Sequence, residues 1–385
     1  MGYEQASVLL NEIIHQATGE SSLQTYDPSD FISVAQTALG LGYDKIHGAI
    51  NQVLGRTIFS IRPYNRKFGD LEMSTMEWGA WTRKIKISDW DWEDAAEFDL
   101  TDGLSVDQWK VKKANPLQLN ILGQNMYMLQ MPSVLMDQMD QAFRGPEELA
   151  SWMAQQTQNG VNMREQKIET LARMLICNFI AAKIDAQNGV IHLLTEYNAE
   201  TGLSLTATSV YAPANFADFI YWLYARMETL AGLMDERSQL FQFNIAGHPI
   251  NQFTDGRNLK IKMFAPLMNA IQARVKATTF QPSYLRMADT EAVSFWQAIE
   301  TPNTINMTPT YLDEATGLAT TGSAVNNSAV IGVMYDREAL GMVRMNERMT
   351  RTPFNAKGCY SNVYYHFLEK WFVDFSEKGI VLLLD

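Results

Sequence analysis

The part of the sequence best suited to chemistry is an acidic run that begins at Asp89. Seven carboxylates fall between residues 89 and 102, and Trp90 and Trp92 alternate with the first three of them. Two carboxylates about 5–9 Å apart can hydrolyse a glycosidic bond, and tryptophan rings can stack on sugars. The run therefore leaves a carbohydrate-active enzyme open, although a solvated acidic face or a protein interface would use the same residue types.

Other catalytic signatures fail when the sequence is searched for them. No Gly-Lys pair exists for a phosphate-binding loop, and there is no Gly-x-Ser-x-Gly elbow. Gly40 and Gly42 open a dinucleotide fingerprint, but Lys45 stands where its third glycine belongs. The histidines are too far apart for a zinc site, and the acidic run lacks the spacing of a calcium loop. We expect no catalytic residue, no metal and no cofactor.

Composition narrows the class of protein further. The chain has 385 residues, 46% of them hydrophobic, which is enough for two or three domains with buried cores. A net charge of −12 disfavours tight binding of nucleic acid, which relies on cationic side chains. No stretch approaches the roughly 18 apolar residues of a membrane span, and the N-terminus lacks the features of a secretory signal. Cys177 and Cys359 are the only cysteines, so no disulfide framework is expected.

The helical patterns lie mainly in the first two thirds of the chain. An Asp-Pro-Ser-Asp start signal precedes Phe31, and another helix is expected over residues 43–54. The longest apolar stripe predicts a helix from Val161 to Gln187, about 40 Å long, with an Asn-Gly interruption just before it at 159–160. A further amphipathic helix is expected over 213–231.

Strand patterns dominate the end of the chain. Residues 362–375 alternate apolar and polar side chains, which is the clearest strand signal in the sequence. Residues 301–329 are rich in Thr, Asn and Gly and predict a long loop. Shorter strands are expected over residues 240–245, 330–334, 342–347 and 380–384.

Residues 60–115 predict a long two-stranded arm. Alternating apolar and basic residues over 81–87 indicate the outgoing strand, and residues 106–111 indicate the returning one. Five of the nine tryptophans fall between residues 78 and 109, more than a two-stranded arm can bury by itself. Left exposed, they would form an aggregation-prone patch. We expect a neighbouring subunit to cover them, the alternative being that the arm folds back on its own domain.

The expected contact residues of this arm combine aromatic rings with basic flanks and an acidic centre. Each buried ring removes about 150–250 Å² of surface, worth at most roughly 4–6 kcal/mol. The charges would set register and specificity more than affinity. The expected contact residues are Trp78, Trp81, Arg83, Lys84, Lys86, Asp89, Trp90, Asp91, Trp92, Glu93, Asp94, Trp109 and Lys110.

The order of these elements resembles the Hong Kong 97-type fold of tailed-phage major capsid proteins. The segment FISVAQTALGLGYDKIHGAINQVLGRTIFSIR (31–62) looks like the N-terminal region of capsid proteins from small short-tailed Bacillus phages. The end, from AVIGVMYDREAL through MVRMNERMTRTPFNAKGCYSNVYYHFLEKWFVDFSEKGIVLL (329–383), is similar to their closing strands. The resemblance implies an α+β fold in five parts: an N-terminal arm (1–59), an E-loop hairpin (60–115), a P domain with a long spine helix (116–212), an A domain (213–338) and returning P-domain strands (339–385).

The resemblance also implies a function. Such a subunit self-assembles, as pentamers and hexamers, into the icosahedral or prolate head that encloses double-stranded phage DNA. Expected partners are further copies of the chain, a portal and non-specifically held DNA, with no membrane; the expected location is the virion capsid, assembled in the bacterial host cytoplasm. The sequence ends at Asp385 after the last strand and opens without an acidic helical leader. It therefore predicts a separate scaffolding protein and no C-terminal immunoglobulin-like domain.

Three alternatives stay open at this point. An encapsulin-like compartment shell shares the fold that the resemblance implies. Another phage structural protein would fit the same composition. A carbohydrate-active enzyme would use the tryptophans and carboxylates of residues 89–102.

Overall fold

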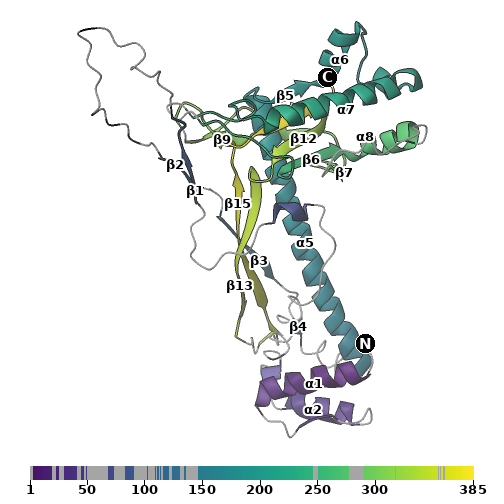
Figure 1. Cartoon of the computed structure of the whole chain (residues 1–385). Coiled ribbons are helices and arrows are strands. Elements are labelled where there is room, and N and C mark those ends of the chain that lie inside the picture. Colours follow the sequence, from purple (N-terminus) through teal and green to yellow (C-terminus); the bar gives the residue numbers. More distant parts are fainter. Residues whose placement is uncertain are drawn as a thin grey trace.

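The fold is described from a computed structural model of the chain. Figure 1 shows a wedge in which one long helix joins a helical foot, where the N-terminus lies, to a broad head that holds the C-terminus. The structure describes residues 3–19, 31–40, 68–72, 83–90, 116–120, 124–130, 134–135, 146–245, 250–276, 290–316, 318–353 and 360–385, together with positions 23–25, 30, 45–46, 49, 102, 109, 111, 113, 355 and 357–358.

The long helix is α5 (Pro146–Asp185), which spans 40 residues or roughly 60 Å at 1.5 Å per residue. Its start at a proline suits the first turn, where a backbone N–H has no partner. The interruption predicted at residues 159–160 is wrong, because the helix continues through both. A glycine in a helix costs only about 1 kcal/mol relative to alanine, and the buried stripe that begins at Val161 holds the helix against the sheet.

A long antiparallel sheet lies beside α5 (Figure 1). It consists of β13 (Leu340–Arg351), β15 (Val363–Val373) and β3 (Gln124–Gln130), with β15 in the centre. Along β15, every second side chain from Val363 to Trp371 is buried. The strand predicted from the alternation over residues 362–375 is therefore confirmed, and its buried face packs against α5.

The foot is built from α1 (Tyr3–Thr18) and α2 (Phe31–Gly40). The predicted start of α2 is confirmed: the backbone carbonyl of Asp30 accepts a hydrogen bond from the Ser33 hydroxyl at 2.8 Å. Both helices share one buried apolar cluster with α5 and the far end of β15. The helix expected over residues 43–54 is described only at positions 45, 46 and 49, which are helical.

The head contains a five-stranded sheet with α6 (Leu193–Thr201) and α7 (Pro213–Asp235) packed on it. The helix predicted over 213–231 is confirmed as α7, which continues to Asp235. β12 is buried along its whole length, because one face meets the helices of the head and the other meets α5. The strand order is β5 (Val190–His192), β16 (Gly379–Leu383), β12 (Val330–Asp336), β6 (Leu259–Phe264) and β7 (Thr290–Val293).

Two predictions for the head are wrong. Residues 240–245 form a turn followed by irregular backbone and one bridge residue instead of a strand, because Phe241 has a φ of 65°, far from the extended region. Residues 301–329 contain paired strands instead of a long loop, since tertiary contacts fix them. The Asn178 side chain, for example, bonds both the N–H and the carbonyl of Thr310, at 2.8 and 2.9 Å. The pairs are β8 (Ile305–Met307) with β11 (Val325–Asn327), and β9 (Thr310–Leu312) with β10 (Ala319–Thr321).

Shorter elements complete the described fold, and no helix among the described residues is long and apolar enough to cross a membrane. These elements are η1 (Gly69–Leu71), β1 (Arg83–Ile87), β2 (Pro116–Asn120), β4 (Val134–Leu135), η3 (Ser209–Tyr211), α8 (Ala265–Ala270), η4 (Ile271–Lys276) and β14 (Tyr360–Ser361).

Candidate subunit interface

The base of the predicted arm is a pair of antiparallel strands that leaves the side of the head (Figure 1). The outgoing strand is confirmed as β1, but its partner is β2, so the returning strand predicted at 106–111 is wrong. Within that range, the described positions Trp109 and Val111 are not in a strand. The observed register sets Lys86 opposite Leu117, so an apolar residue and not a like charge faces the lysine. Like charges that face each other across two strands are destabilising.

Residues 68–72, which the sequence pattern places in the arm, lie on the body. Phe68 and Leu71 are buried, and Glu72 makes a single bridge to Met342 of β13. Asp70 accepts an ion-pair hydrogen bond from the buried Lys262 at 2.7 Å. Residues 68–72 therefore belong to the body and not to the projecting part of the arm.

The first anchor of the arm is a buried ion pair. Lys86 on β1 reaches Glu377, with Nζ and Oε1 2.8 Å apart, and both side chains are 7% exposed. The same ammonium donates to the backbone carbonyl of Ser376 at 3.3 Å. Residues 374–379, here called the anchor turn, connect β15 to β16. The pair therefore fixes β1 to the point where the long sheet enters the head.

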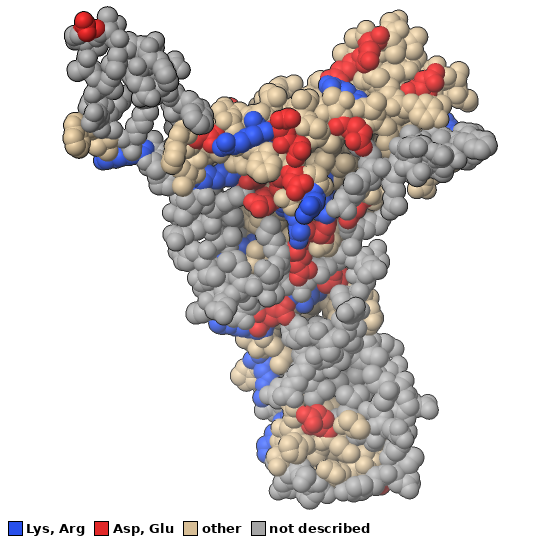
Figure 2. Space-filling view, viewed as in Figure 1, with Lys and Arg blue, Asp and Glu red and all other residues tan. Residues whose placement is uncertain are grey.

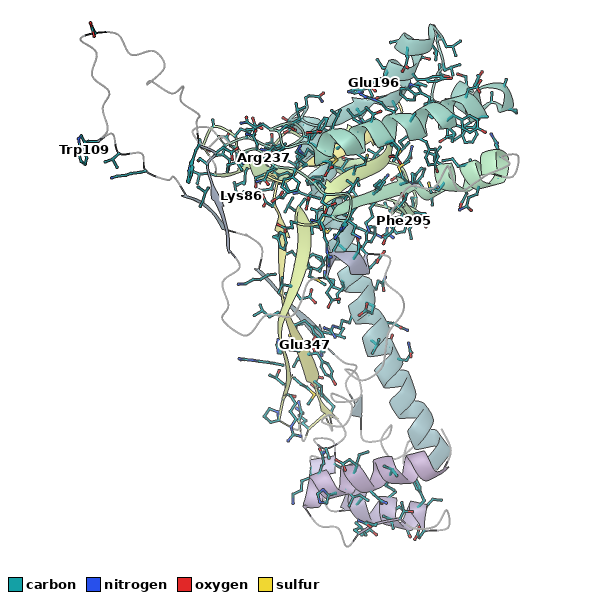
Figure 3. All side chains as sticks on the ribbon, in the orientation of Figure 1. Lys86, Trp109, Glu196, Arg237, Phe295 and Glu347 are labelled. Carbon is teal, nitrogen blue, oxygen red and sulfur yellow. The ribbon has the colours of Figure 1, made fainter. Side chains whose placement is uncertain are left out.

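A second anchor holds the end of β1. One oxygen of Asp89 accepts from the guanidinium of Arg237, and the other accepts from the backbone N–H of Asn251 at 2.7 Å. Arg237 and Asn251 both belong to the segment that follows α7. Figure 3 shows Lys86 and Arg237 close together where the arm meets the head.

A second buried lysine, Lys378, holds the anchor turn against the end of α7. The Lys378 ammonium donates to the carbonyl of Glu236 at 2.6 Å and to the Ser238 hydroxyl at 2.9 Å. Glu236 caps the C-terminus of α7, where the helix dipole favours a cation. Burial lowers the pKa of Lys378. The anchor turn, which binds Lys86, is therefore itself hydrogen-bonded to the end of α7.

Beyond these anchors the arm presents large apolar side chains to solvent. Trp90 is 82% exposed and Trp109 is 87% exposed, and Ile87 and Val111 are exposed as well. Figure 3 shows Trp109 well away from the head. Exposed apolar groups gathered on one segment are typical of a surface that a partner covers.

The structure brings together only part of the expected contact set. Lys86, Asp89 and Trp90 lie within five residues at the arm base, while Arg83 and Lys84 lie on β1 opposite Asn120 and Leu119. Sequence reasoning missed the four residues that anchor them, Ser376, Glu377, Arg237 and Asn251, because nothing local connects them to the arm. Outside the described residues lie Trp78, Trp81, Asp91, Trp92, Glu93, Asp94 and Lys110. Contact between the arm and a neighbour stays a prediction.

A groove of about 660 Å³ lies on the body between α5 and the long sheet. Met128 and Met163 line it and are 58% and 48% exposed. Arg164 forms its floor, paired with Glu347 and lying 4.6 Å from the centre of the Phe367 ring. The lining combines five apolar side chains with five polar or charged ones.

The acidic run contributes one carboxylate to the arm base, and this carboxylate makes a structural contact. Asp89, the first carboxylate of the acidic run, is already engaged by Arg237 and Asn251. Among the described residues, no group of histidine, cysteine and acidic side chains is arranged to hold a metal ion. In the face shown in Figure 2, described lysines and arginines are interspersed with acidic residues over the head. Such mixed charge does not form the broad basic field of a protein that grips nucleic acid.

A spine helix, a long sheet beside it, a mixed head and an anchored two-stranded arm define a class: the subunits of Hong Kong 97-type phage capsids. The sequence model for the Phi29-like phage major capsid protein family matches residues 10–374. The chain belongs to this family. It is therefore a capsid subunit of a phage virion, and it assembles with copies of itself into the shell of the head.

Two solved structures are similar to the chain, and the first of them supports the fold. A chain in the structure of the head fiber and inner core protein gp22 of native bacteriophage P68 has a TM-score of 0.55 at 8% identity, covering 84% of this chain and 86% of that one. A chain in the capsid structure of Staphylococcus phage Andhra has a TM-score of 0.49 at 9% identity, with the same coverage. At such identities the likeness concerns the fold alone. No curated protein matches the sequence.

Proposed function

We propose that the arm of each subunit clasps a neighbouring subunit in the shell, through Trp90, Trp109 and the other contact residues expected from the sequence. The observation that carries this proposal is the contrast between an exposed apolar arm and its firmly anchored base. A partner that meets a pre-oriented arm loses less conformational freedom on binding than one that meets a free chain. Anchoring therefore favours assembly.

The groove between α5 and the long sheet is the proposed receptor for a neighbour's arm. Its exposed methionines can adapt to the shape of an incoming aromatic ring.

Several finer assignments belong to the same proposal. The five parts are the N-terminal arm (1–59), the E-loop (60–115), the P domain (116–212), the A domain (213–338) and the returning strands (339–385), the last of which also supplies β16 to the head sheet. The shell assembles in the host cytoplasm with a portal and a separate scaffolding protein, and holds double-stranded DNA non-specifically. The net charge of −12 supports loose contact with DNA. The chain has no catalytic role.

Replacing Trp90 and Trp109 together with alanine tests the arm. We expect a folded, soluble subunit with at least about tenfold less shell assembly, because two rings no longer bury their surface on a neighbour. Electron microscopy and sedimentation velocity measure the particles. Tyr221→Ala, which removes a 45% exposed ring on α7, should assemble normally. Normal particles from the double tryptophan variant would overturn the proposal.

A charge placed in the groove tests the receptor. Met163→Glu should reduce assembly about tenfold or more, because an arm that fills the groove would leave the carboxylate without water. Met174→Glu is the matched control, since Met174 lies on the same helix, is 55% exposed and does not line the groove. Equal assembly by the two variants, measured by light scattering, would exclude the groove as the receptor while leaving the arm proposal standing.

A further inference from the structure

The last turn of α5 places a lysine in the interior of the head. The Lys183 side chain is fully buried, and its ammonium donates to the carbonyl oxygen of Phe241 at 2.8 Å and, more weakly, to Asn188 at 3.4 Å. It lies over the rings of Phe243 and Phe179, at 4.9 and 5.7 Å from their centres. No carboxylate within the described residues forms an ion pair with it, so a charge on this amine is buried without a paired counter-ion.

The residue that receives this ammonium has a strained backbone. Phe241 has a φ of 65°, a left-handed conformation that is unfavourable for a bulky side chain. Its carbonyl accepts from the backbone N–H of Gly379 at 2.8 Å as well as from Lys183, and the Phe243 N–H donates to the Phe375 carbonyl at 2.8 Å. Strain of this kind persists only while the surrounding contacts enforce it.

The segments that meet at Lys183 are the same ones that carry the arm. The anchor turn (374–379) holds Lys86, and the segment after α7 holds Asp89. Stacked rings connect the two: Phe375 lies 5.1 Å from Phe243 and 5.6 Å from Phe179. A shift of the Lys183 side chain is therefore transmitted through packed aromatic rings to the two segments that anchor the arm.

We propose that the protonation state of Lys183, on the spine helix, controls the direction of the arm. Lys183 in this role is here called the pin. When Lys183 carries a proton, the junction between residues 241–243 and the anchor turn is loosened; when Lys183 is neutral, the junction closes and the arm base is held. This inference rests on the proposed function of the arm and adds its regulation.

The direction of the pH dependence follows from the burial of the Lys183 amine. Burial lowers the pKa of Lys183 from the ordinary value of 10.5 to about 7, opposed by the attraction of Glu314. The unfolded or opened chain therefore binds a proton up to about pH 10.5, whereas the closed chain releases it above about pH 7. Between these values closure becomes more favourable as the pH rises, and below about pH 7 the full penalty of a buried charge applies.

The other ionisable groups around the junction have partners of their own. Glu314 accepts from the Asn244 N–H at 3.1 Å. Asp185 accepts from the Tyr311 hydroxyl at 2.7 Å, which lowers the pKa of the acid and raises that of Tyr311 to about 12. Those two groups therefore do not change charge near neutral pH. The charged residues on the anchor turn are Asp374, which accepts from the backbone N–H of Ser376 at 2.9 Å, Glu377, paired with Lys86, and Lys378, bonded to the end of α7.

Hydrogen exchange of the full, unassembled chain tests the pin. After correction for the intrinsic pH dependence of exchange, peptides covering 83–89 and 374–379 should become at least about tenfold more protected from about pH 6 to about pH 8.5. Lys183→Met should be protected throughout, with little dependence on pH. Lys357→Met removes an exposed lysine and should keep the wild-type response. The same pH response in Lys183→Met and wild type would overturn the pin.

A second measurement requires no variant. The ¹³C chemical shifts of labelled lysine side chains, followed by NMR as the pH is changed, give the pH at which the buried Lys183 amine releases its proton. A transition near pH 7 supports the pin, and one near 10.5 overturns it. Neither measurement needs a shell. A chain that never forms shells would thus defeat the proposed function of the arm, whereas an unresponsive Lys183 would defeat only the pin.

Discussion

Replacing Glu377 with alanine should destabilise the subunit by roughly 3–5 kcal/mol, because it leaves the ammonium of Lys86 buried without its carboxylate. Both side chains are 7% exposed, so solvent cannot take over the role of the missing partner. The remaining bond, from Lys86 to the carbonyl of Ser376, is 3.3 Å long and carries no opposite charge. Chemical denaturation followed by circular dichroism measures the loss.

A partly exposed ion pair on the same head provides the control. Arg226 and Glu196 are 2.8 Å apart with side chains 28% and 35% exposed. Exposed pairs of this kind contribute about 0–1 kcal/mol, so Glu196→Ala should cost little. A loss for Glu377→Ala no larger than that for Glu196→Ala would contradict the anchoring role of the buried pair.

The double variant Lys86→Met with Glu377→Leu separates charge from packing. Replacing a buried ion pair by apolar side chains of similar size is often neutral or stabilising. We therefore expect the double variant to recover most of the stability that Glu377→Ala loses. If its stability recovers but shell assembly does not, the pair fixes the direction of the arm; if both recover, packing alone suffices.

The sequence predicted those elements whose signal is local. The alternation along β15 and the apolar stripes of α5 and α7 are repeated many times within one segment, so the period alone identifies the element. The break expected at 159–160 was wrong because one weak helix residue is outweighed by the buried turns that follow it from Val161 onward. The resemblance to tailed-phage capsid proteins rested on the order of such elements, and the family match confirms it.

The features that could not be predicted from the sequence depend on contacts between residues that are far apart in the chain. Lys86 and Ser376 are 290 positions apart, and no property of residues 374–379 announces that a strand from the arm will bind there. The strand expected at 240–245 failed for the same reason, since the backbone of Phe241 is set by Lys183 and Gly379. The aromatic and charged composition of the arm indicated an interface, but which side chains anchor it and which remain exposed required the fold.

The turn that follows α5 yields the other large expected effect, because two glycines with the same backbone conformation differ in their surroundings. Gly189 and Gly202 have φ values of 71° and 70°. A Cβ at Gly189 would lie 2.5 Å from the carbonyl oxygen of Gly379, whereas a Cβ at Gly202 would meet nothing within 4 Å. The carbonyl of Gly189 also accepts from the Val381 N–H at 2.8 Å, where β5 joins β16. The backbone at Gly189 therefore cannot move away without opening the head sheet.

Gly202→Ala should lower the free energy of unfolding by about 1–2 kcal/mol, because alanine disfavours the left-handed conformation. Gly189→Ala should lower it by roughly 3–5 kcal/mol in total, because the new Cβ also clashes with rigid backbone. Thermal unfolding of the two variants measures the difference, which isolates the clash because the φ angles match. Equal losses would mean that β16 shifts freely beside β5. The anchor turn ends at Gly379, where β16 begins. If Gly189→Ala caused no loss of stability, β16 and the anchor turn would be free to shift, and they could not hold the arm base in one direction.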